Sequence, residues 1–465
     1  MRFRHGILLL WLVSSIVARA QSSSRMALVH RWDNDAGPTL GSQQYNDVYG
    51  WYDGVKQREY AILCGIDSIY FFDVTQPEQP VLCATQAGKS TGCRNRSVLT
   101  YGHYAYAVAD QGNSSLQVFD LRYLPDSVSK VYDSDSLCIR AHTIVVDTFS
   151  ARLYLCHNKR RHPQNGQLIM EALTILSVQQ PEQPVYLGTL QPPVSEGTPL
   201  FDFVHEAAAY RDTVFCSTGS SGLFIYDLGN VLQPVIIRAI TEYPEKGFNH
   251  SPAYDPQRKL LSFTDESAGT AVKLYSTSNF TSWQQRSLFR SSTGALAHKS
   301  YFKGDTLWVA YYHDGVWVFD VRNPDQVQPL AWYDTFEQTD YNGILGCWGV
   351  YPYLPSGIVL ASDMSNGLFI LRPDTTIGIK EKLIDKTIKL YPNPAAVELT
   401  VKLGILAPQT RSIKLFSRWG ETLYTSNGPF NNIHSIAVNQ LAQGMYMVFI
   451  EGENFSKALH LAIIR

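Results

Sequence analysis

The sequence has nearly balanced charge and lacks any long run of basic residues. Lys and Arg together number 39 and Asp and Glu together number 41, which gives a formal net charge of −2. A protein that binds nucleic acid through the phosphate backbone presents a basic patch or stripe. This chain has none, so nucleic acid is excluded as a partner.

The sequence also lacks an apolar run long enough to cross a bilayer. The apolar run at residues 7–17 has about half the length of a membrane-spanning helix. It follows two arginines and precedes the small residues Ala18 and Ala20, an arrangement typical of a secretory signal peptide. We therefore predict a signal peptide over residues 1–20, export to the periplasm, and a mature protein with no membrane span.

The motifs of several enzyme classes are missing too. There is no GxSxG, HExxH or P-loop pattern, no GxGxxG followed by a helix, and no CxxC pair. The seven cysteines are an odd number, so at least one thiol is expected to stay free, and the spacing does not define any pairing. Cys156 and Cys216 occupy matching strand positions, where a small buried apolar residue is the favoured interpretation.

Short strands separated by turns are abundant. Residues 298–320 contain three strands with turns at Gly304-Asp305 and at His313-Asp314-Gly315, which is typical of a β-meander. Seven copies of this unit recur at steps of about 44 to 57 residues, the period of four-stranded propeller blades. The third strands of the copies end at Asp73, Asp120, Ser177, Asp227, Ser276, Asp320 and Arg372.

A fourth strand follows most copies after a turn that contains proline. Proline fits the start of an outer strand because an edge strand can lack one ladder hydrogen bond. The seventh copy stops at Pro373 without such a strand, and residues 26–33 resemble one. We therefore predict an all-β fold, a seven-bladed β-propeller over residues 26–373, in which the N-terminal strand completes the last blade and closes the ring.

The repeat pattern ends at residues 374–385, a short polar and charged segment that we interpret as a linker. Residues 386–465 then show alternating strands with glycine turns, and we predict that they form a small β-sandwich.

This last segment resembles the type A C-terminal sorting domain of the type IX secretion system. The resemblance rests on the opening Tyr391-Pro392-Asn393-Pro394 and on Leu441-x-x-Gly444-x-Tyr446 near the C-terminus. It implies that the type IX secretion machinery is a partner. It also implies that the protein is secreted or displayed at the cell surface.

The repeat segment resembles the LVIVD-repeat proteins, in particular the group called choice-of-anchor B. The resemblance lies in the order and spacing of short motifs over nearly all of residues 46–373, and it implies an architecture without implying an activity. These motifs are Tyr101-Gly102-His103-Tyr104-Ala105-Tyr106, Ala141-His142, Asn249-His250-Ser251, Ala297-His298, Trp348-Gly349-Val350-Tyr351-Pro352 and residues 361–373.

One register recurs at the start of the first strand of every copy. In a closed propeller the first strands run along the central channel, so equivalent positions face one another. We predict a ligand site at the channel mouth, for a glycan or a protein ligand. The residues in this register are Asn46, Arg96, His142, His205, His250, His298 and Trp348.

Four of these residues are histidines, and imidazole is a common metal ligand. We therefore consider a transition-metal site, for zinc or copper, made of His142, His205, His250 and His298. Two observations favour other interpretations. Histidines at blade entries are often structural, and the neighbouring cations Arg96 and Lys299 oppose a metal and favour an anionic ligand.

If the ring is catalytic, Glu206 is the best general base and Asp47 the second, because hydrolysis at a metal needs a group that takes a proton from water. Both are adjacent to ring residues, so strand alternation predicts that they point away from the channel. The leading interpretation is an exported binding module with its ligand site at the channel mouth. A metal-dependent hydrolase or lyase is the alternative, and a purely structural surface component is the third.

Overall fold

The computed structural model describes residues 23–336, 343–374, 387–417, 422–452 and 456–464. These residues form an all-β protein of antiparallel sheets, most of them four-stranded, with the short 3-10 helix η1 (Gly404–Gln409). The predicted signal peptide and all but the first residue of the predicted linker lie outside the described residues. The chain divides into two compact units: the larger comprises residues 1–303 and 307–373, and the main part of the smaller is Asp374–Arg465.

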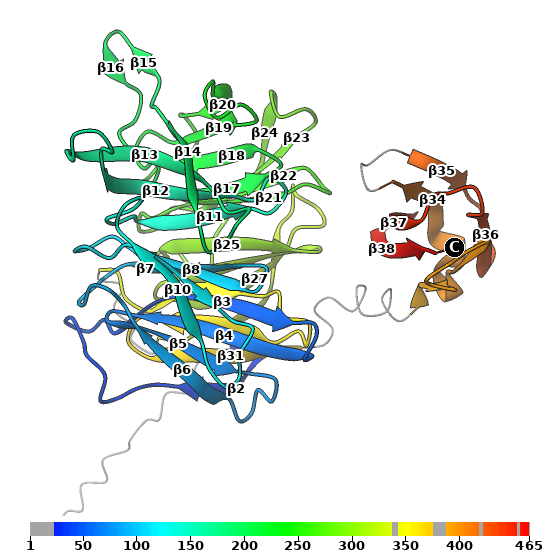
Figure 1. The fold of residues 1–465 in the computed structure, drawn as a ribbon, viewed down its shortest axis with the longest axis horizontal. Helices are drawn as coiled ribbons and strands as arrows, with labels where there is room; N and C mark the ends of the chain where they lie inside the picture. The colour runs from blue at the N-terminus through cyan, green and yellow to red at the C-terminus, as the bar shows by residue number, and fades with distance from the viewer. Residues whose placement is uncertain (1–22, 337–342, 375–386, 418–421, 453–455, 465) are drawn as a thin grey trace, which may run out of the picture. The chain divides into compact units, whose positions relative to one another are not determined.

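The larger unit contains seven sheets in which consecutive strands pair antiparallel (Figure 1). The first two sheets consist of β3 (Tyr45–Asp53), β4 (Arg58–Gly65), β5 (Ser68–Asp73) and β6 (Val81–Ala87), and of β7 (Arg96–Tyr101), β8 (Tyr104–Ala109), β9 (Leu116–Asp120) and β10 (Ser129–Ser134). The next two consist of β11 (Thr143–Asp147), β12 (Arg152–Arg161), β13 (Leu168–Ser177) and β14 (Val185–Leu190), and of β17 (Glu206–Tyr210), β18 (Thr213–Ser217), β19 (Leu223–Asp227) and β20 (Val235–Ile240).

The fifth and sixth sheets consist of β21 (Asn249–Asp255), β22 (Leu260–Asp265), β23 (Val272–Thr277) and β24 (Trp283–Phe289), and of β25 (Ala297–Lys303), β26 (Thr306–Tyr311), β27 (Gly315–Asp320) and β28 (Gln328–Tyr333). The seventh consists of β29 (Cys347–Tyr351), β30 (Val359–Asp363), β31 (Gly367–Pro373) and β2 (Met26–Trp32). The short β1 (Ser23–Ser24) adds to the outer edge of the sixth sheet, and β15 (Val194–Ser195) pairs with β16 (Thr198–Pro199) in a separate ribbon.

Burial follows the position of a strand in its sheet. Every residue of the second strand β8 is buried, whereas most of the fourth strand β6 is exposed or half-buried. Side chains of neighbouring sheets pack together; Ile62 and Phe71 of the first sheet share a hydrophobic cluster with Val98 and Phe119 of the second. Strands covered on both faces read as continuous apolar runs, which accounts for the repeated apolar segments of the sequence.

An aspartate ends the third strand in several sheets, and its carboxylate starts the following turn. Oδ1 of Asp73 accepts a hydrogen bond from the backbone N–H two residues later at 2.9 Å, and Asp120 and Asp320 do the same at 3.0 Å. Such Asx turns hold the chain as it reverses toward the fourth strand. The recurring aspartate of the repeat therefore has a local structural cause.

The first strands of the seven sheets form a closed series of contacts. Each contacts the first strand of the next sheet, and β29 of the seventh contacts β3 of the first. The two ends of the unit meet in the seventh sheet, because β2 pairs antiparallel with β31, with Met26 opposite Pro373 and Trp32 opposite Leu368. In Figure 1 the dark blue β2 accordingly lies beside the yellow β31.

Gly367 lies where this N-terminal strand approaches the last sheet most closely. Its φ is +88°, and a Cβ there would lie 2.1 Å from the carbonyl oxygen of Trp32. We expect Gly367→Ala to cost more than the roughly 1–2 kcal/mol of a left-handed residue alone. The matched control is Gly357→Ala, since Gly357 has a φ of +82° and open space around its Cβ position. Chemical denaturation measures both costs, and equal losses would contradict the close approach of β2.

The smaller unit contains two antiparallel sheets. One consists of β32 (Lys389–Tyr391), β33 (Glu398–Lys402) and β36 (Ile433–Ala437), and the other of β35 (Thr422–Asn427), β34 (Thr410–Phe416), β37 (Gly444–Gly452) and β38 (Ser456–Ile463). Leu399 and Ile436 of the first sheet share one buried hydrophobic cluster with Ile413 and Val448 of the second. The unit therefore has a core of its own.

Candidate functional site

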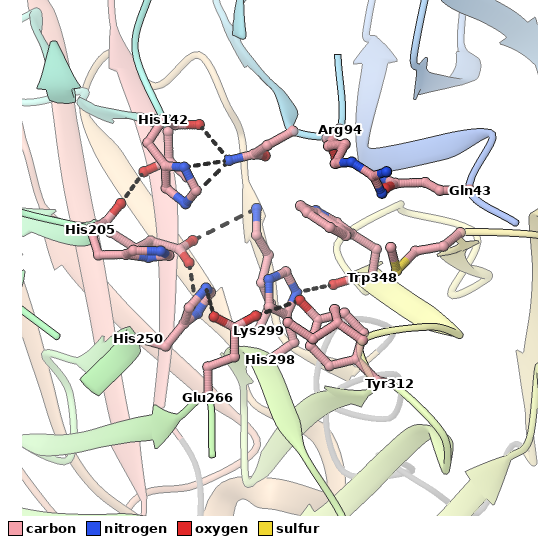
Figure 2. A pocket seen from close by; sticks show the side chains of 15 residues that line it. Gln43, Arg94, His142, His205, His250, Glu266, His298, Lys299, Tyr312 and Trp348 are labelled. Carbon is pink, nitrogen blue, oxygen red and sulfur yellow. Dashed lines mark hydrogen bonds and ion pairs between the residues drawn. The ribbon is translucent and has the colours of Figure 1, made fainter. Parts of the chain in front are cut away.

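A cavity of about 300 Å³ lies where the first strands of the sheets begin. Figure 2 shows side chains from several sheets around it. Five of the seven residues predicted for the ligand site, the four histidines and Trp348, are among those that line it. The titratable side chains of the lining, apart from Arg94, are His142, His205, Glu206, His250, Glu266, His298, Lys299 and Tyr312.

The four histidines lie side by side in the order of their sheets. The ring centroids of His142 and His205 are 4.0 Å apart, those of His205 and His250 4.6 Å, and those of His250 and His298 4.4 Å. Trp348 continues the series at 4.8 Å from His298. Each residue lies one position before or after the first residue of a first strand, and these strands contact one another in turn. Equivalent positions therefore converge on one space.

Asn46 and Arg96 are not among the residues that line the cavity. The side-chain amide of Asn46 donates a hydrogen bond to the carbonyl oxygen of Arg94 at 2.6 Å. The guanidinium of Arg96 is 1 % exposed and donates to backbone carbonyl oxygens, including that of Gly65 at 3.1 Å. These contacts tie the first two sheets together, which gives both residues a structural role. Arg94 and Asn95 line the cavity in their place.

Hydrogen bonds fix the rings of two of the histidines. Nδ1 of His298 contacts the carbonyl oxygen of Trp348. A carbonyl only accepts, so Nδ1 carries the proton and Nε2 keeps its lone pair in the neutral ring. Nδ1 of His142 lies 2.7 Å from the amide nitrogen of Asn95 and 3.1 Å from Asp110. Both rings are therefore held by neighbours at the cavity wall.

His205 and His250 are held less completely. Nδ1 of each is buried without a hydrogen-bond partner. Two glutamates flank His250: Oε2 of Glu206 lies 3.3 Å from Nδ1, and Oε2 of Glu266 lies 3.9 Å from Nε2. The hydroxyl of Tyr312 donates to Oε1 of Glu266 at 2.6 Å and so orients that carboxylate.

The Glu206 side chain lines the cavity, although strand alternation predicts that it points away. The reason is that β17 begins at Glu206, so the preceding His205 lies outside the regular pleat. Alternation constrains neighbours only within a strand, and here the two consecutive side chains share one cavity. The expected orientation of Glu206 is therefore wrong.

Lys299 is buried with its charge compensated by two carboxylates. Its Nζ lies 2.8 Å from Oδ2 of Asp47 and 3.7 Å from Oε1 of Glu206. Burial opposes the charged lysine, but Asp47 and Glu206 outweigh it and hold the pKa of Lys299 well above its usual range. Asp47, the second candidate base, thus holds Lys299 and is not among the lining residues.

Burial also controls protonation in the rest of the site. It raises the pKa of Glu206 to about 7, against the opposing charge of Lys299, and it raises the pKa of Glu266. Burial, together with neighbouring positive charge, lowers the pKa values of His205, His250 and His298 well below the usual range. These three imidazoles are therefore neutral near pH 7, the form in which imidazole binds a metal ion.

The buried histidines make stability sensitive to acid. Their pKa values in the folded chain lie well below 6.5, so the unfolded chain binds more protons, and the stability present above about pH 6.5 is lost as the pH falls. Glu206 changes stability with pH in the opposite direction. Because its pKa is raised, it stabilises the folded chain below pH 4.5, and this stabilisation is lost as the pH rises toward 7.

The parent protein is expected to lose free energy of unfolding between pH 6.5 and pH 4.5, and His250→Gln should lose less. The variant takes up one proton fewer on unfolding, and each such proton contributes at most about 1.4 kcal/mol per pH unit. Urea denaturation of the variant and the parent at both pH values measures the difference. An identical acid dependence would contradict the burial of a neutral His250.

The repeat register does not predict Glu266, Tyr312 or Asn95. Glu266 and Tyr312 are the first residues after the second strands β22 and β26. A second strand runs antiparallel to the first, so its end lies beside the start of the first strand, where the histidines are. The position directly after each second strand is therefore where the sequence indicates residues such as Glu266 and Tyr312.

The residues predicted for sorting lie in the smaller unit. The side chain of Asn393 donates to the carbonyl oxygen of His460 at 2.8 Å and accepts from the N–H of Ala462 at 3.0 Å. Gly444 is the first residue of β37, and the hydroxyl of Tyr446 donates to the carbonyl oxygen of Ala442 at 2.7 Å. The two Asn393 contacts attach the opening segment, with Tyr391, Pro392 and Pro394, to the last strand of the unit.

Residues 389–464 match the family described as the secretion system C-terminal sorting domain. The sorting resemblance expected from the sequence is thereby confirmed. The protein is one that is secreted or attached to the cell surface, and it interacts with the secretion machinery. The match does not extend into the larger unit, where the LVIVD-repeat and choice-of-anchor B resemblance stays a prediction.

The other comparisons leave the activity open. No curated protein matches the chain. The solved structure of Saccharomyces cerevisiae Sqt1 is similar, with 12% identity and a TM-score of 0.46, over 71% of this chain and 96% of that one. Among the described residues no helix has the length and apolar character needed to cross a membrane. All seven cysteines are free, and all but Cys83 are buried.

Proposed function

We propose that this protein is a secreted or surface-attached seven-bladed β-propeller that binds a small polar ligand in the cavity at its hub. The observation that carries the proposal is a set of buried polar atoms at the cavity that make no hydrogen bond: Nδ1 of His205, and Nδ1 of His250 and Oε2 of Glu206, which lie 3.3 Å apart without hydrogen-bond geometry. Buried polar groups are nearly always hydrogen-bonded, and an unpaired group needs an explanation such as an ion or another occupant.

The seven-bladed arrangement is supported by the number and order of the sheets. Seven sheets follow one another along the chain, their first strands contact in a closed series, and β2 joins the chain ends in the seventh. The LVIVD-repeat resemblance agrees with this arrangement. Export begins with the predicted signal peptide over residues 1–20 and continues through the type IX machinery, which takes up the sorting domain.

The size and lining of the cavity favour the end of a glycan or of a protein chain. A volume of about 300 Å³ is at the small end of ligand pockets. Carboxylates and imidazoles offer hydrogen-bond partners, and the rings of Tyr312 and Trp348 offer apolar faces. An aromatic face with nearby polar groups suits a ligand that is part apolar and part polar.

The proposal is tested by screening the purified protein against glycans and against peptides with free ends, followed by titration of the hits. We expect Glu206→Gln to weaken a hit by about tenfold, the order of one hydrogen bond to a charged group. Glu242→Gln is the matched control, because the Glu242 side chain is 87% exposed and outside the cavity. The binding role would be contradicted if no glycan or peptide in a broad screen bound, or if Glu206→Gln left the affinity for every hit unchanged.

A metal-dependent hydrolase or lyase is the second candidate, and the placement of Glu206 favours it. Its carboxyl group lines the cavity and has a pKa of about 7, which suits a group that takes or gives a proton near neutral pH. Assays with hydrolase and lyase substrates test this candidate. Turnover that disappears in Glu206→Gln and persists in Glu242→Gln supports it, and no turnover over the panel counts against it.

A further inference from the structure

We infer that His205, His250 and Glu266 bind one divalent transition-metal ion at the hub, an inference that rests on the proposed binding role of the cavity. All three side chains line the cavity. Each offers one donor atom, and the three donor atoms lie within 4.8 Å of one another. They come from two neighbouring sheets: His205 lies just before β17, His250 lies in β21, and Glu266 lies just after β22, the strand that pairs with β21.

The donor set suits such an ion. Two imidazoles and one carboxylate are a common protein ligand set for zinc, with metal–ligand distances of about 2.0–2.2 Å and a further position open to water or another ligand. At those distances the donor atoms of a tetrahedral site lie roughly 3.3 Å apart. The donor atoms, now within 4.8 Å of one another, therefore need to approach by up to about 1.5 Å around the ion, which side-chain rotamer adjustment can supply.

Glu206 supplies the partner that a metal-binding histidine requires. Such a histidine almost always donates its other ring N–H to a carboxylate, a carbonyl oxygen or water. His250 lies between two carboxylates, with Oε2 of Glu206 at 3.3 Å from Nδ1 and Oε2 of Glu266 at 3.9 Å from Nε2. An ion bound at Nε2 places the proton on Nδ1, which then donates to Glu206. The two unpaired buried atoms, Nδ1 of His250 and Oε2 of Glu206, become partners.

The charges around these residues favour a cation. Glu206 and Glu266 are two carboxylates in one buried site. Lys299 lies 2.8 Å from Asp47 and 3.7 Å from Glu206, so Asp47, Glu206 and Glu266 together exceed the charge of Lys299 and of Arg94, which also lines the cavity. Arg96, the other cation that argued against a metal, donates to backbone carbonyl oxygens outside the cavity lining. A divalent ion balances the excess negative charge that burial makes costly.

This ligand set differs from the four histidines that the repeat register indicates. His142 is held by Asn95 and Asp110, at 2.7 Å and 3.1 Å from its Nδ1. His298 donates from Nδ1 to Trp348 and lies 4.4 Å from His250 between ring centroids. His298 therefore flanks the ion, and its unprotonated Nε2 is suited to accept a hydrogen bond from a water bound there.

Titration with Co²⁺ and Zn²⁺ tests the inference on the full secreted chain, purified without nickel resin and stripped with a chelator. We expect saturable binding of one ion per chain and a visible Co²⁺ absorption band from nitrogen and oxygen ligands. Glu266→Gln should weaken the affinity by more than tenfold and Glu206→Gln by about 10- to 100-fold. The controls Glu242→Gln and His162→Ala, at the surface and in the loop after β12, should leave it unchanged.

The inference is overturned if neither ion binds saturably, or if Glu266→Gln binds as tightly as the parent. Circular dichroism establishes that each variant is folded. If a variant is not folded, the test uses the melting temperature of the parent protein. Excess Zn²⁺ must raise it, because an ion that binds only the folded state stabilises that state. An unchanged melting temperature overturns the inference.

The outcomes separate this inference from the proposed function. Glycan or peptide binding by the metal-stripped protein, without any binding of Co²⁺ or Zn²⁺, overturns the metal site alone. Metal binding without any hit among glycans and peptides overturns the proposed ligand role alone and leaves the metal site in place.

Discussion

Replacing Lys299 with methionine is expected to lower the free energy of unfolding by about 3–5 kcal/mol, because removal of one member of a buried ion pair leaves the other charge uncompensated. Lys299 is 4 % exposed, and its Nζ lies 2.8 Å from Asp47 and 3.7 Å from Glu206. Methionine keeps most of the side-chain volume, so the decrease in free energy of unfolding measures the removal of the charge and not the creation of a cavity. Chemical denaturation at pH 7 measures it.

An exposed pair provides the control. Lys246 lies 3.2 Å from Glu242, whose side chain is 87% exposed, so Lys246→Met should cost less than about 1 kcal/mol. In the double variant Lys299→Met with Asp47→Asn, the second change removes the stranded charge. More than half of the loss should then be recovered, and the double-mutant cycle gives the coupling. A loss below about 1 kcal/mol in Lys299→Met would contradict the buried network.

Trp32→Ala is expected to lower the free energy of unfolding by about 3 kcal/mol, the low end for truncating a large core aromatic side chain, since Trp32 is only half-buried. Trp32 belongs to β2 of the seventh sheet and packs on the first sheet. Its ring centroid lies 4.7 Å from that of Phe72 and 5.2 Å from that of Tyr70. The side chain therefore joins the last sheet to the first.

Hydrogen exchange shows where the Trp32→Ala effect acts. If β2 closes the ring, exchange should rise in β31 and in the first sheet, while the fourth sheet, β17 to β20, keeps the protection of the parent. Loss of protection spread evenly over all sheets, or none near β31, would contradict closure by the N-terminal strand. Local opening of this kind is expected where a few contacts hold one element.

Much of the fold is readable from the sequence, because each sheet is built from local hairpins. Apolar runs bounded by glycine and aspartate define the strands, and the aspartate that ends a third strand makes the turn that follows. The sequence also predicts that the four histidines lie together, since equivalent strand positions in contacting sheets face one another. These features depend on neighbours in sequence or on exact repetition.

The residues that contact the histidines cannot be predicted from the repeat in the same way. Glu266 and Tyr312 follow second strands, and no residue type repeats there, so only the pairing of first and second strands brings them to the cavity. In the second sheet the lining residues are Arg94 and Asn95, which precede the start of β7 at Arg96. Residues before a strand do not follow its alternation, so the repeat register does not find them.

The orientation of Lys299 shows the same limit. As a cation next to His298 it argues against a metal, but its charge is held by Asp47, a residue that precedes it by 252 positions in the chain. Only the closed series of sheets places the two together. The sequence therefore predicts which types of side chain are present, and the fold decides which charges cancel.

A crystal structure of the secreted chain soaked with Zn²⁺, with data collected at the zinc absorption edge, is the most direct measurement. We predict one anomalous peak at the hub of seven sheets, within bonding distance of His205, His250 and Glu266, with Glu206 hydrogen-bonded to His250. No peak in the cavity would contradict the metal site, and imidazoles that do not share one cavity would contradict the central claim that the hub is a binding site.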